Sequence, residues 1–160
     1  YNVVTGVQTC ALPISAHKGW KIPETTLCYP WIKRMFPEIH YIFWVRDPRD
    51  CITGRHLTDD LRDFGIDCPA TDDVHLRRAI SWKYQNELVR ATGRPDRWIK
   101  VRLEDFVRHQ KRELARLESF LGIPLARIPV KTDPVGRHAS HPEILFPDFL
   151  NAALAEHGYG

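Results

Sequence analysis

The feature that most constrains the fold is an unbroken apolar run, YIFWV at residues 41–45, which is followed at once by the charged sequence RDPRD. Strands covered on both faces of a parallel sheet have continuous apolar sequences, whereas half-exposed strands alternate apolar and polar residues. The run therefore predicts a short, buried strand in a parallel sheet. A second strand is predicted over 97–103, RWIKVRL.

Helices are predicted around these strands, because apolar residues recur every three to four positions. In the first helix, over 24–36, Pro30 either bends the helix or marks a restart. A long helix is predicted over about 72–93, and an amphipathic helix ends at Gly122, its expected C-cap. The stripes expected on the first two helices are Leu27, Trp31 and Met35, then Leu76, Ile80, Tyr84 and Leu88.

The order of these elements predicts the fold class. A final helix is expected over roughly 142–157, and the aspartate-rich stretch 59–73 is interpreted as a polar surface loop. Helix, strand, helix, helix, strand, helix is the alternation of an α/β domain, in which a parallel sheet is flanked by helices.

The composition is that of one globular domain and excludes several classes of protein. Apolar residues make up 43% of the 160 residues and charged residues 27%. No apolar run approaches the roughly 18–20 residues needed to cross a bilayer, so no membrane span is expected. The formal net charge of +3 suits a small anionic ligand as well as nucleic acid. The spacing of Cys10, Cys28, Cys51 and Cys68 predicts a reduced, cytoplasmic setting.

The junction between the first predicted strand and the next helix is the first candidate site. Ligands of open parallel sheets bind beyond the carboxyl ends of the strands, which is where Arg46 belongs. A helix that begins near Pro48 adds free backbone N–H groups, which suit phosphate or sulfate, and Arg49 and Arg55 add charge nearby. An alternative without a ligand is that Arg46 and Asp47 pair with each other and cap the turn.

Five segments in one order carry a family resemblance. They are WKIPET from Trp20, FPEIHYIFWVRDPRDCITG from Phe36, WKYQN from Trp82, IKVRLEDF from Ile99 and FLGIP from Phe120. Together they resemble the sulfotransferases that use 3′-phosphoadenosine-5′-phosphosulfate (PAPS), over nearly all of residues 20–159. The resemblance implies a P-loop nucleotide-binding type of α/β fold and PAPS as the sulfuryl donor, with no metal expected.

The resemblance also implies residues that bind the nucleotide. The strand-end arginine, here Arg46, binds the 3′-phosphate in that family. A serine eight residues later normally shares this contact, but Gly54 stands there. Its backbone N–H and the hydroxyl of Thr53 are expected to substitute, although the glycine is equally a choice for close helix packing. Gly136 and Arg137, in GRH, resemble the basic segment that closes over the same phosphate, since a guanidinium meets two phosphate oxygens at once.

Two residues of WKIPET are candidates for the transfer step. Lys21 aligns with a family lysine that lies close to the transferring group. Pro23 stands where some members have a catalytic histidine, which leaves Glu24 as the nearest carboxylate and the candidate base. The alternative for Glu24 is a first-turn glutamate that stabilises the helix dipole.

Other candidate residues are given structural roles. Leu103 replaces the tyrosine of the family's Tyr-Glu-Asp segment, and Glu104 is expected to fix the strand end along with Asp105. His138 and His141 lack a third ligand for zinc. The thiol at position 51 is expected to be buried packing rather than a nucleophile.

The stretch before residue 16 is expected not to be native protein. From Val4 to Ile14 it reads, codon by codon, as a common sequencing-adapter primer. Residues 16–160 are then a partial domain that lacks the family's first strand and its glycine- and serine-rich phosphate loop. On this hypothesis the chain as written is marginally stable and inactive, and soluble expression with sulfuryl transfer would contradict it.

The function predicted for the parent protein is transfer of a sulfuryl group from PAPS to a hydroxyl or amine. The acceptor is a small molecule or carbohydrate, and no nucleic-acid partner is expected. Two alternatives stay open. One is a P-loop nucleotide kinase, which needs a Gly-Lys-Ser/Thr loop and magnesium-binding carboxylates. The other is a non-catalytic nucleotide-binding module of the same fold.

Overall fold

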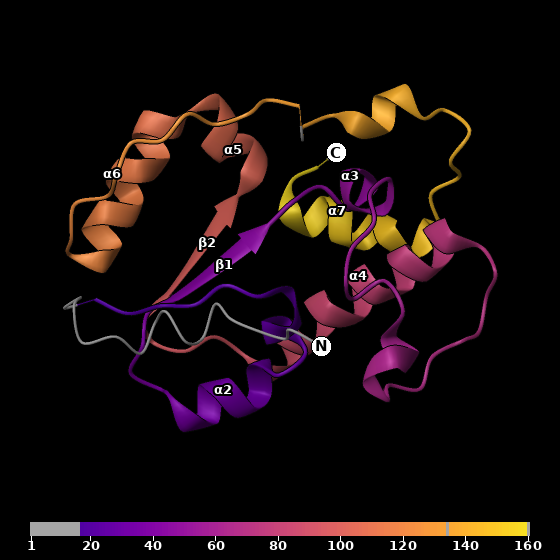
Figure 1. The fold of residues 1–160 in the computed structure, drawn as a ribbon, viewed down its shortest axis with the longest axis horizontal. Helices are drawn as coiled ribbons and strands as arrows, with labels where there is room; N and C mark the ends of the chain where they lie inside the picture. The colour runs from indigo at the N-terminus through magenta and orange to yellow at the C-terminus, as the bar shows by residue number, and fades with distance from the viewer. Residues whose placement is uncertain (1–16, 134, 160) are drawn as a thin grey trace, which may run out of the picture.

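The computed structural model describes residues 17–133 and 135–159, and it shows a mixed α/β fold around two parallel strands (Figure 1). β1 (Tyr41–Val45) and β2 (Trp98–Arg102) run side by side, with Tyr41 opposite Trp98. The α/β class, both strands and their parallel direction are confirmed. The chain that joins them contains α3 (Pro48–Ile52), the 3-10 helix η2 (Leu61–Phe64) and α4 (Val74–Thr92).

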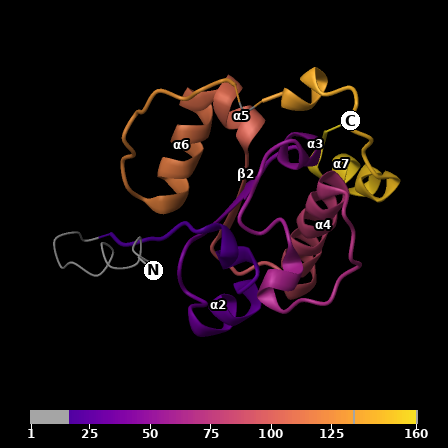
Figure 2. The same ribbon diagram turned by 45° about the vertical axis from the view of Figure 1, so that its right-hand side comes forward.

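Helices lie on both sides of the strand pair, as two views show (Figure 1, Figure 2). α5 (Leu103–Arg108) and α6 (Gln110–Leu121) follow β2 on one side, while α2 (Tyr29–Met35) and α4 lie on the other. The remaining elements are η1 (Pro23–Thr26), η3 (Arg137–Ser140), η4 (Asp148–Leu150) and α7 (Asn151–His157).

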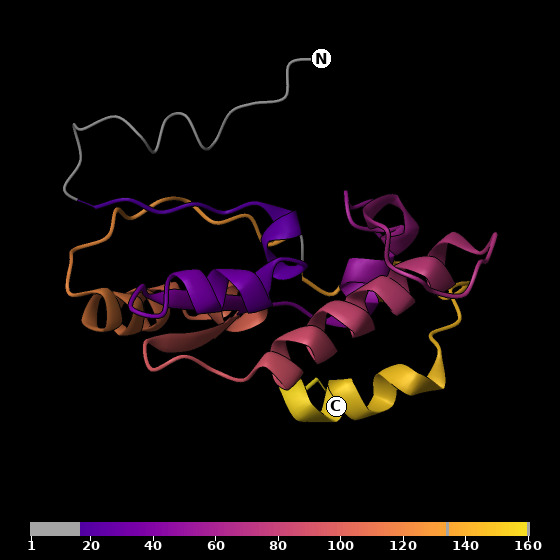
Figure 3. The ribbon, with the colours of Figure 1, turned by 90° about the horizontal axis from the view of Figure 1, so that it is seen from below.

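Three apolar clusters form the core. The first joins β2 to α5 and α6, the second joins β1 to α2 and α4, and the third joins α3 and α4 to the C-terminal segment. Figure 3 shows η4 and α7 lying beneath α4, where this third cluster forms. The buried members are, in that order, Ile99, Val101, Phe106, Leu114 and Leu117; Tyr29, Tyr41 and Val89; Ile52, Ala79, Ile144 and Leu150.

Several local sequence signals form the structures that they predict. The Asp47 carboxylate caps α3 by accepting the backbone N–H of Arg49, and Pro48 occupies its first turn. Gly122 has a φ of 69° at the end of α6, a left-handed conformation that glycine adopts without a Cβ clash. Pro30 marks a restart, because η1 ends before it and α2 begins beside it.

The prediction that β1 is buried on both faces is wrong for one face. Tyr41 and Val45 are buried, whereas Ile42 and Trp44 are 42% and 45% exposed. The physical reason is that both side chains border an open cavity, and α5 covers Trp44 only in part, through the Phe106 ring at a centroid distance of 5.1 Å.

The predicted stripe of the first helix is also wrong. Leu27 is buried, but Trp31 and Met35 are 64% and 68% exposed. The break between η1 and α2 changes the helical phase before Pro30, so Leu27 no longer shares a face with Trp31 and Met35.

The buried face of α4 differs from its predicted stripe. Ala79, Ser81 and Val89 are the buried positions. The predicted leucines, isoleucine and tyrosine are only half-buried. α4 packs against α3 through Ala79 and against α2 through Val89, and the four-residue spacing of the larger apolar residues does not mark that face.

Two further predictions, the loop over 59–73 and the final helix over roughly 142–157, are wrong in part. The stretch 59–73 is polar, but it contains η2, whose Leu61 is 1% exposed and anchors it to the body of the domain. The final helical segment begins at Asp148 rather than near 142, because Pro147 is extended, with φ −64° and ψ 139°.

The segment up to residue 15, predicted to be non-native, lies outside the described residues. In the part of the chain that is described, every helix is too short or too polar to cross a lipid bilayer.

Candidate functional site

A cavity of about 470 Å³ opens beside β1 and at its carboxyl end. Four predicted site residues line it, although they come from widely separated parts of the chain: Lys21, Arg46, Gly54 and Arg137. Other lining residues with a charged or imidazole side chain are Arg55, His56, Arg78 and Asp59. Cationic groups therefore outnumber carboxylates, which makes the cavity suited to an anion.

Arg46 directly follows β1, and a carboxylate of α3 attracts its side chain. Its guanidinium lies 3.8 Å from the Asp50 carboxylate, and its side chain is 21% exposed. The alternative predicted an ion pair between Arg46 and Asp47. This part is wrong, because Asp47 forms its ion pair with Arg49 at 2.8 Å. The capping part of that alternative is confirmed. Asp47 thus holds the turn, while Arg46 borders the cavity.

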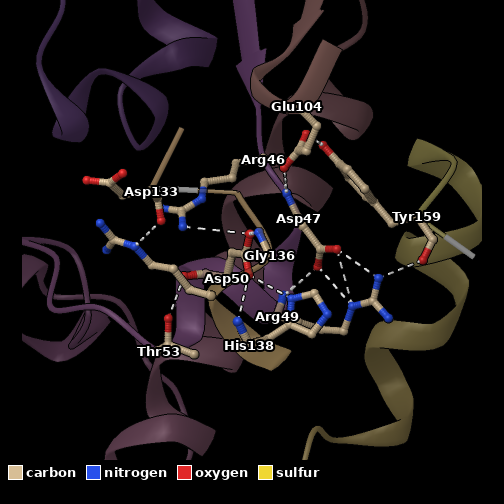
Figure 4. A network of polar contacts seen from close by, with 11 residues as sticks. Arg46, Asp47, Arg49, Asp50, Thr53, Glu104, Asp133, Gly136, His138 and Tyr159 are labelled. Carbon is tan, nitrogen blue, oxygen red and sulfur yellow. Dashed lines mark hydrogen bonds and ion pairs between the residues drawn. The ribbon is translucent and has the colours of Figure 1, made fainter. Parts of the chain in front are cut away.

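Asp50 joins α3 to the segment that carries Arg137 (Figure 4). Its carboxylate is 1% exposed and accepts the backbone N–H groups of Gly136, at 2.7 Å, and His138, at 2.9 Å. The ring nitrogen Nδ1 of His138 lies 2.7 Å from the same carboxylate. Burial raises the pKa of Asp50, but the hydrogen bonds from His138 and Gly136 outweigh it, and the net pKa is lowered.

Arg137 itself is exposed at the rim of the cavity. Its Nε donates a 3.0 Å hydrogen bond to the carbonyl of Asp133, and Gly136 beside it has a φ of 78°. The sharp turn at Gly136 lets the adjacent amides reach Asp50 while the guanidinium stays outside. Gly136 is therefore a turn residue held by α3, and it does not line the cavity.

A second buried network fixes the junction of β1 and α5 (Figure 4). Glu104 accepts the backbone N–H of Asp47 and the phenol of Tyr159, each at 2.9 Å. Arg49 donates to the Tyr159 carbonyl, also at 2.9 Å. Burial and the neighbouring carboxylate raise the pKa of Tyr159. The prediction that Glu104 fixes the strand end is confirmed.

Thr53 and Gly54, the predicted substitutes for the family's serine, form hydrogen bonds within the chain. The Thr53 hydroxyl donates to the Asp50 carbonyl within its own helix, at 2.9 Å. The Gly54 N–H donates to the Cys51 carbonyl at 3.3 Å. A Cβ built on Gly54 meets nothing within 4 Å, so the close-packing interpretation of this glycine is wrong. Position 54 faces open space in the cavity.

The two candidates from WKIPET separate in space. Lys21 is exposed and lines the cavity, whereas Glu24 is half-buried and is not among the lining residues. Glu24 occupies the first turn of η1, as its alternative interpretation predicts. Of the two candidates, Lys21 therefore lies in the cavity and Glu24 lies outside its lining.

Sequence reasoning missed a polar cluster that also lines the cavity. Arg78 donates to the Asp59 carboxylate at 2.9 Å and to the Ile52 carbonyl at 3.1 Å. Thr58, 1% exposed, bonds to Nδ1 of His56 at 2.8 Å. On α4, Arg78, Ser81 and Gln85 fall on one side of the helix, and this polar stripe was the signal in the sequence.

Neither a nucleophilic role for Cys51 nor a metal site is supported in the described part of the chain. Burial raises the pKa of the Cys51 thiol to about 12, so it is protonated at neutral pH. Among residues 17–133 and 135–159, no three histidine, cysteine or acidic side chains are grouped as a metal site requires.

A comparison with protein families identifies the chain's relatives. The model described as the sulfotransferase family matches residues 3–127, most of the sequence. The chain belongs to the sulfotransferase family. No curated protein and no solved structure matches it. The general chemistry of sulfotransferases is sulfuryl transfer, and the matched region includes Lys21, Arg46 and Gly54 of the cavity.

Proposed function

We propose that this sulfotransferase-family chain binds PAPS in the cationic cavity and transfers its sulfuryl group to a hydroxyl or amine. The observation that carries the proposal is the convergence of Lys21, Arg46 and Arg137 on one cavity from three distant segments. The parallel strands, with Arg46 directly after β1, agree with a P-loop nucleotide-binding type of fold.

Each cation has a proposed part in binding. Arg46 and Arg137 hold the 3′-phosphate, because guanidinium groups form paired hydrogen bonds with phosphate oxygens. Lys21 lies near the sulfuryl group, where a mobile ammonium offsets charge on the transferring oxygens. Gly54 leaves room beside the phosphate that its relatives fill with a serine.

The proposed chemistry is a direct displacement. The acceptor oxygen or nitrogen forms a bond to sulfur as the bond from sulfur to the phosphate oxygen breaks. The acceptor's proton passes to a base or to solvent, and adenosine 3′,5′-bisphosphate leaves. The residues described here bind and neutralise the anionic groups, as cationic side chains do in phosphoryl transfer.

Nucleotide binding is the first test. Trp20, Trp44 and Trp82 line the cavity, so their fluorescence reports occupancy. We expect adenosine 3′,5′-bisphosphate to bind at least about 10-fold more tightly than adenosine 5′-phosphate, since an additional charge-assisted contact contributes roughly 1.5–3 kcal/mol. Arg46→Lys and Arg137→Ala each reduce this preference.

The matched control is Arg62→Ala. Arg62 is an exposed arginine paired with Asp60 and does not line the cavity, so its loss leaves the preference intact. Equal binding of the two nucleotides by the unmodified chain would contradict the proposal.

A non-catalytic nucleotide-binding module is the second candidate. Gly54 favours it, because glycine has no side chain to bind phosphate and its backbone N–H donates to the Cys51 carbonyl. Binding of the bisphosphate without transfer from PAPS to any hydroxyl or amine acceptor would support the module. Binding that requires ATP and magnesium instead would support the kinase alternative.

A further inference from the structure

The Asp50 carboxylate lies between two cationic segments that are far apart in sequence. Its three short hydrogen-bond contacts all go to residues 86 or 88 positions away, and none goes to an N–H group of its own helix. A carboxylate that served only to stabilise α3 would bond within α3 or its cap. Asp47 already performs that capping.

The same carboxylate acts on Arg46 and Arg137 by different means. It attracts the Arg46 guanidinium directly, at 3.8 Å. It acts on Arg137 through the backbone, because it holds the amide before Arg137 and the amide after it. Figure 4 shows Asp50 between Arg46 and the turn at Gly136.

We propose that Asp50 is a positioning residue that couples Arg46 to the Gly136–His138 turn, so that both arginines are set for one 3′-phosphate. This inference rests on the proposed function. Because Asp50 is almost fully buried, it does not touch the nucleotide. This role does not require Asp50 to contact solvent or ligand. Its lowered pKa keeps the carboxylate ionised, so its hydrogen bonds to the turn persist at neutral pH.

The test compares variants of two buried aspartates, Asp50 in α3 and Asp47 at the N-cap of the same helix. Asp50→Asn replaces one accepting oxygen by an N–H donor that faces the donors of the turn. We expect it to weaken binding of adenosine 3′,5′-bisphosphate by about 10-fold or more, the loss that follows from one charge-assisted hydrogen bond. Binding of adenosine 5′-phosphate, which lacks the 3′-phosphate, is expected to stay within about 2-fold.

Asp47→Asn is the matched control. Asp47 is 5% exposed and caps the same helix, but it makes no bond to Gly136 or His138. We expect this variant to lose stability while it keeps its preference for the bisphosphate. Backbone hydrogen exchange supplies a second readout: the amides of Gly136 and His138 are protected in the parent chain, and Asp50→Asn releases them whereas Asp47→Asn does not.

If Asp50→Asn does not fold, His138→Phe tests the same coupling more gently. It removes only the ring contact to Asp50 and keeps an aromatic ring beside Phe146. We expect a reduced preference for the bisphosphate, by a few-fold, with the fold intact. Equal loss of preference in Asp47→Asn and Asp50→Asn, or an unchanged preference in the Asp50 and His138 variants, would overturn the inference. A parent chain without any preference would instead reject the proposed function.

Discussion

The phenol of Tyr159 donates a 2.9 Å hydrogen bond to the Glu104 carboxylate, which ties the last turn of the described chain to the start of α5. Glu104 is 4% exposed and also accepts the N–H of Asp47, so this bond supports the turn that begins α3. The candidate site therefore depends on a contact between residues 55 positions apart.

Tyr159→Phe tests this contact. The change leaves a buried carboxylate oxygen without its donor, which costs roughly 1–3 kcal/mol in the free energy of unfolding. Urea denaturation followed by circular dichroism measures the loss. Tyr84→Phe, at a half-buried position of α4 outside this network, is the control and is expected to change stability by less than about 0.5 kcal/mol. Equal effects of the two variants would argue against a special role for Tyr159.

Gly54→Ser is expected to increase nucleotide affinity. A Cβ at position 54 meets no neighbour within 4 Å, and the backbone there is not left-handed, so a serine fits without strain. Its hydroxyl adds one hydrogen bond to a 3′-phosphate, worth about 5- to 10-fold in the dissociation constant of adenosine 3′,5′-bisphosphate.

Gly54→Ala separates the hydroxyl from the Cβ. It is expected to leave the affinity for the bisphosphate unchanged, as measured by the same fluorescence titration. If alanine and serine have the same effect, the hydroxyl is not the group that binds, and position 54 is not part of the phosphate site.

The pH dependence of stability is expected to include a contribution from His157. Burial, followed by the positive charge of Lys100, lowers the pKa of this imidazole from 6.5, and its ring packs on Trp82. Below pH 6.5 the unfolded chain takes up a proton that the folded chain does not. The stabilisation that neutral His157 provides is therefore fully present above about pH 6.5. The free energy of unfolding then decreases as the pH falls toward the lowered pKa.

Urea titrations between about pH 7.5 and pH 5.5 measure this slope, which for one proton is at most about 1.4 kcal/mol per pH unit. His157→Phe is expected to reduce it, because phenylalanine keeps the packing and cannot be protonated. His109→Gln, at an exposed position, is expected to leave it unchanged. An unaltered slope in His157→Phe would assign the pH dependence to other groups.

Leu27→Ala and Met35→Ala test the break between η1 and α2. Leu27 is 8% exposed and Met35 is 68% exposed, although they are spaced as members of one helical stripe. We expect a loss of about 2–4 kcal/mol for the buried leucine and less than about 0.5 kcal/mol for the methionine. Comparable losses, measured by thermal or urea unfolding, would restore the single-helix interpretation.

Much of the local structure could be predicted from the sequence. Residues 41–45 form a strand because the run consists of aromatic and β-branched residues, which favour strands. Asp47, Pro48, Pro30 and Gly122 mark helix ends through their own backbone preferences. These signals act within a few residues, so no knowledge of distant segments is required. The same holds for Arg46, which follows the strand directly.

Residues that act over long distances could be found only in the tertiary structure. Asp50 looks like an ordinary helix aspartate in the sequence, yet its partners Gly136 and His138 lie 86 and 88 positions away. Glu104 is predicted to fix the strand end, but its partners, 55 and 57 positions away, are identified only by the fold. The exposure of Ile42, Trp44 and Met35 likewise depends on which surfaces the other elements cover. Hydrophobic periodicity specifies the type of element, whereas the neighbours of each face are decided by how all elements pack together. For this chain, the sequence determined the strands, the helix ends at Asp47, Pro30 and Gly122, and the cationic residues, and tertiary packing decided which of those cations share a cavity.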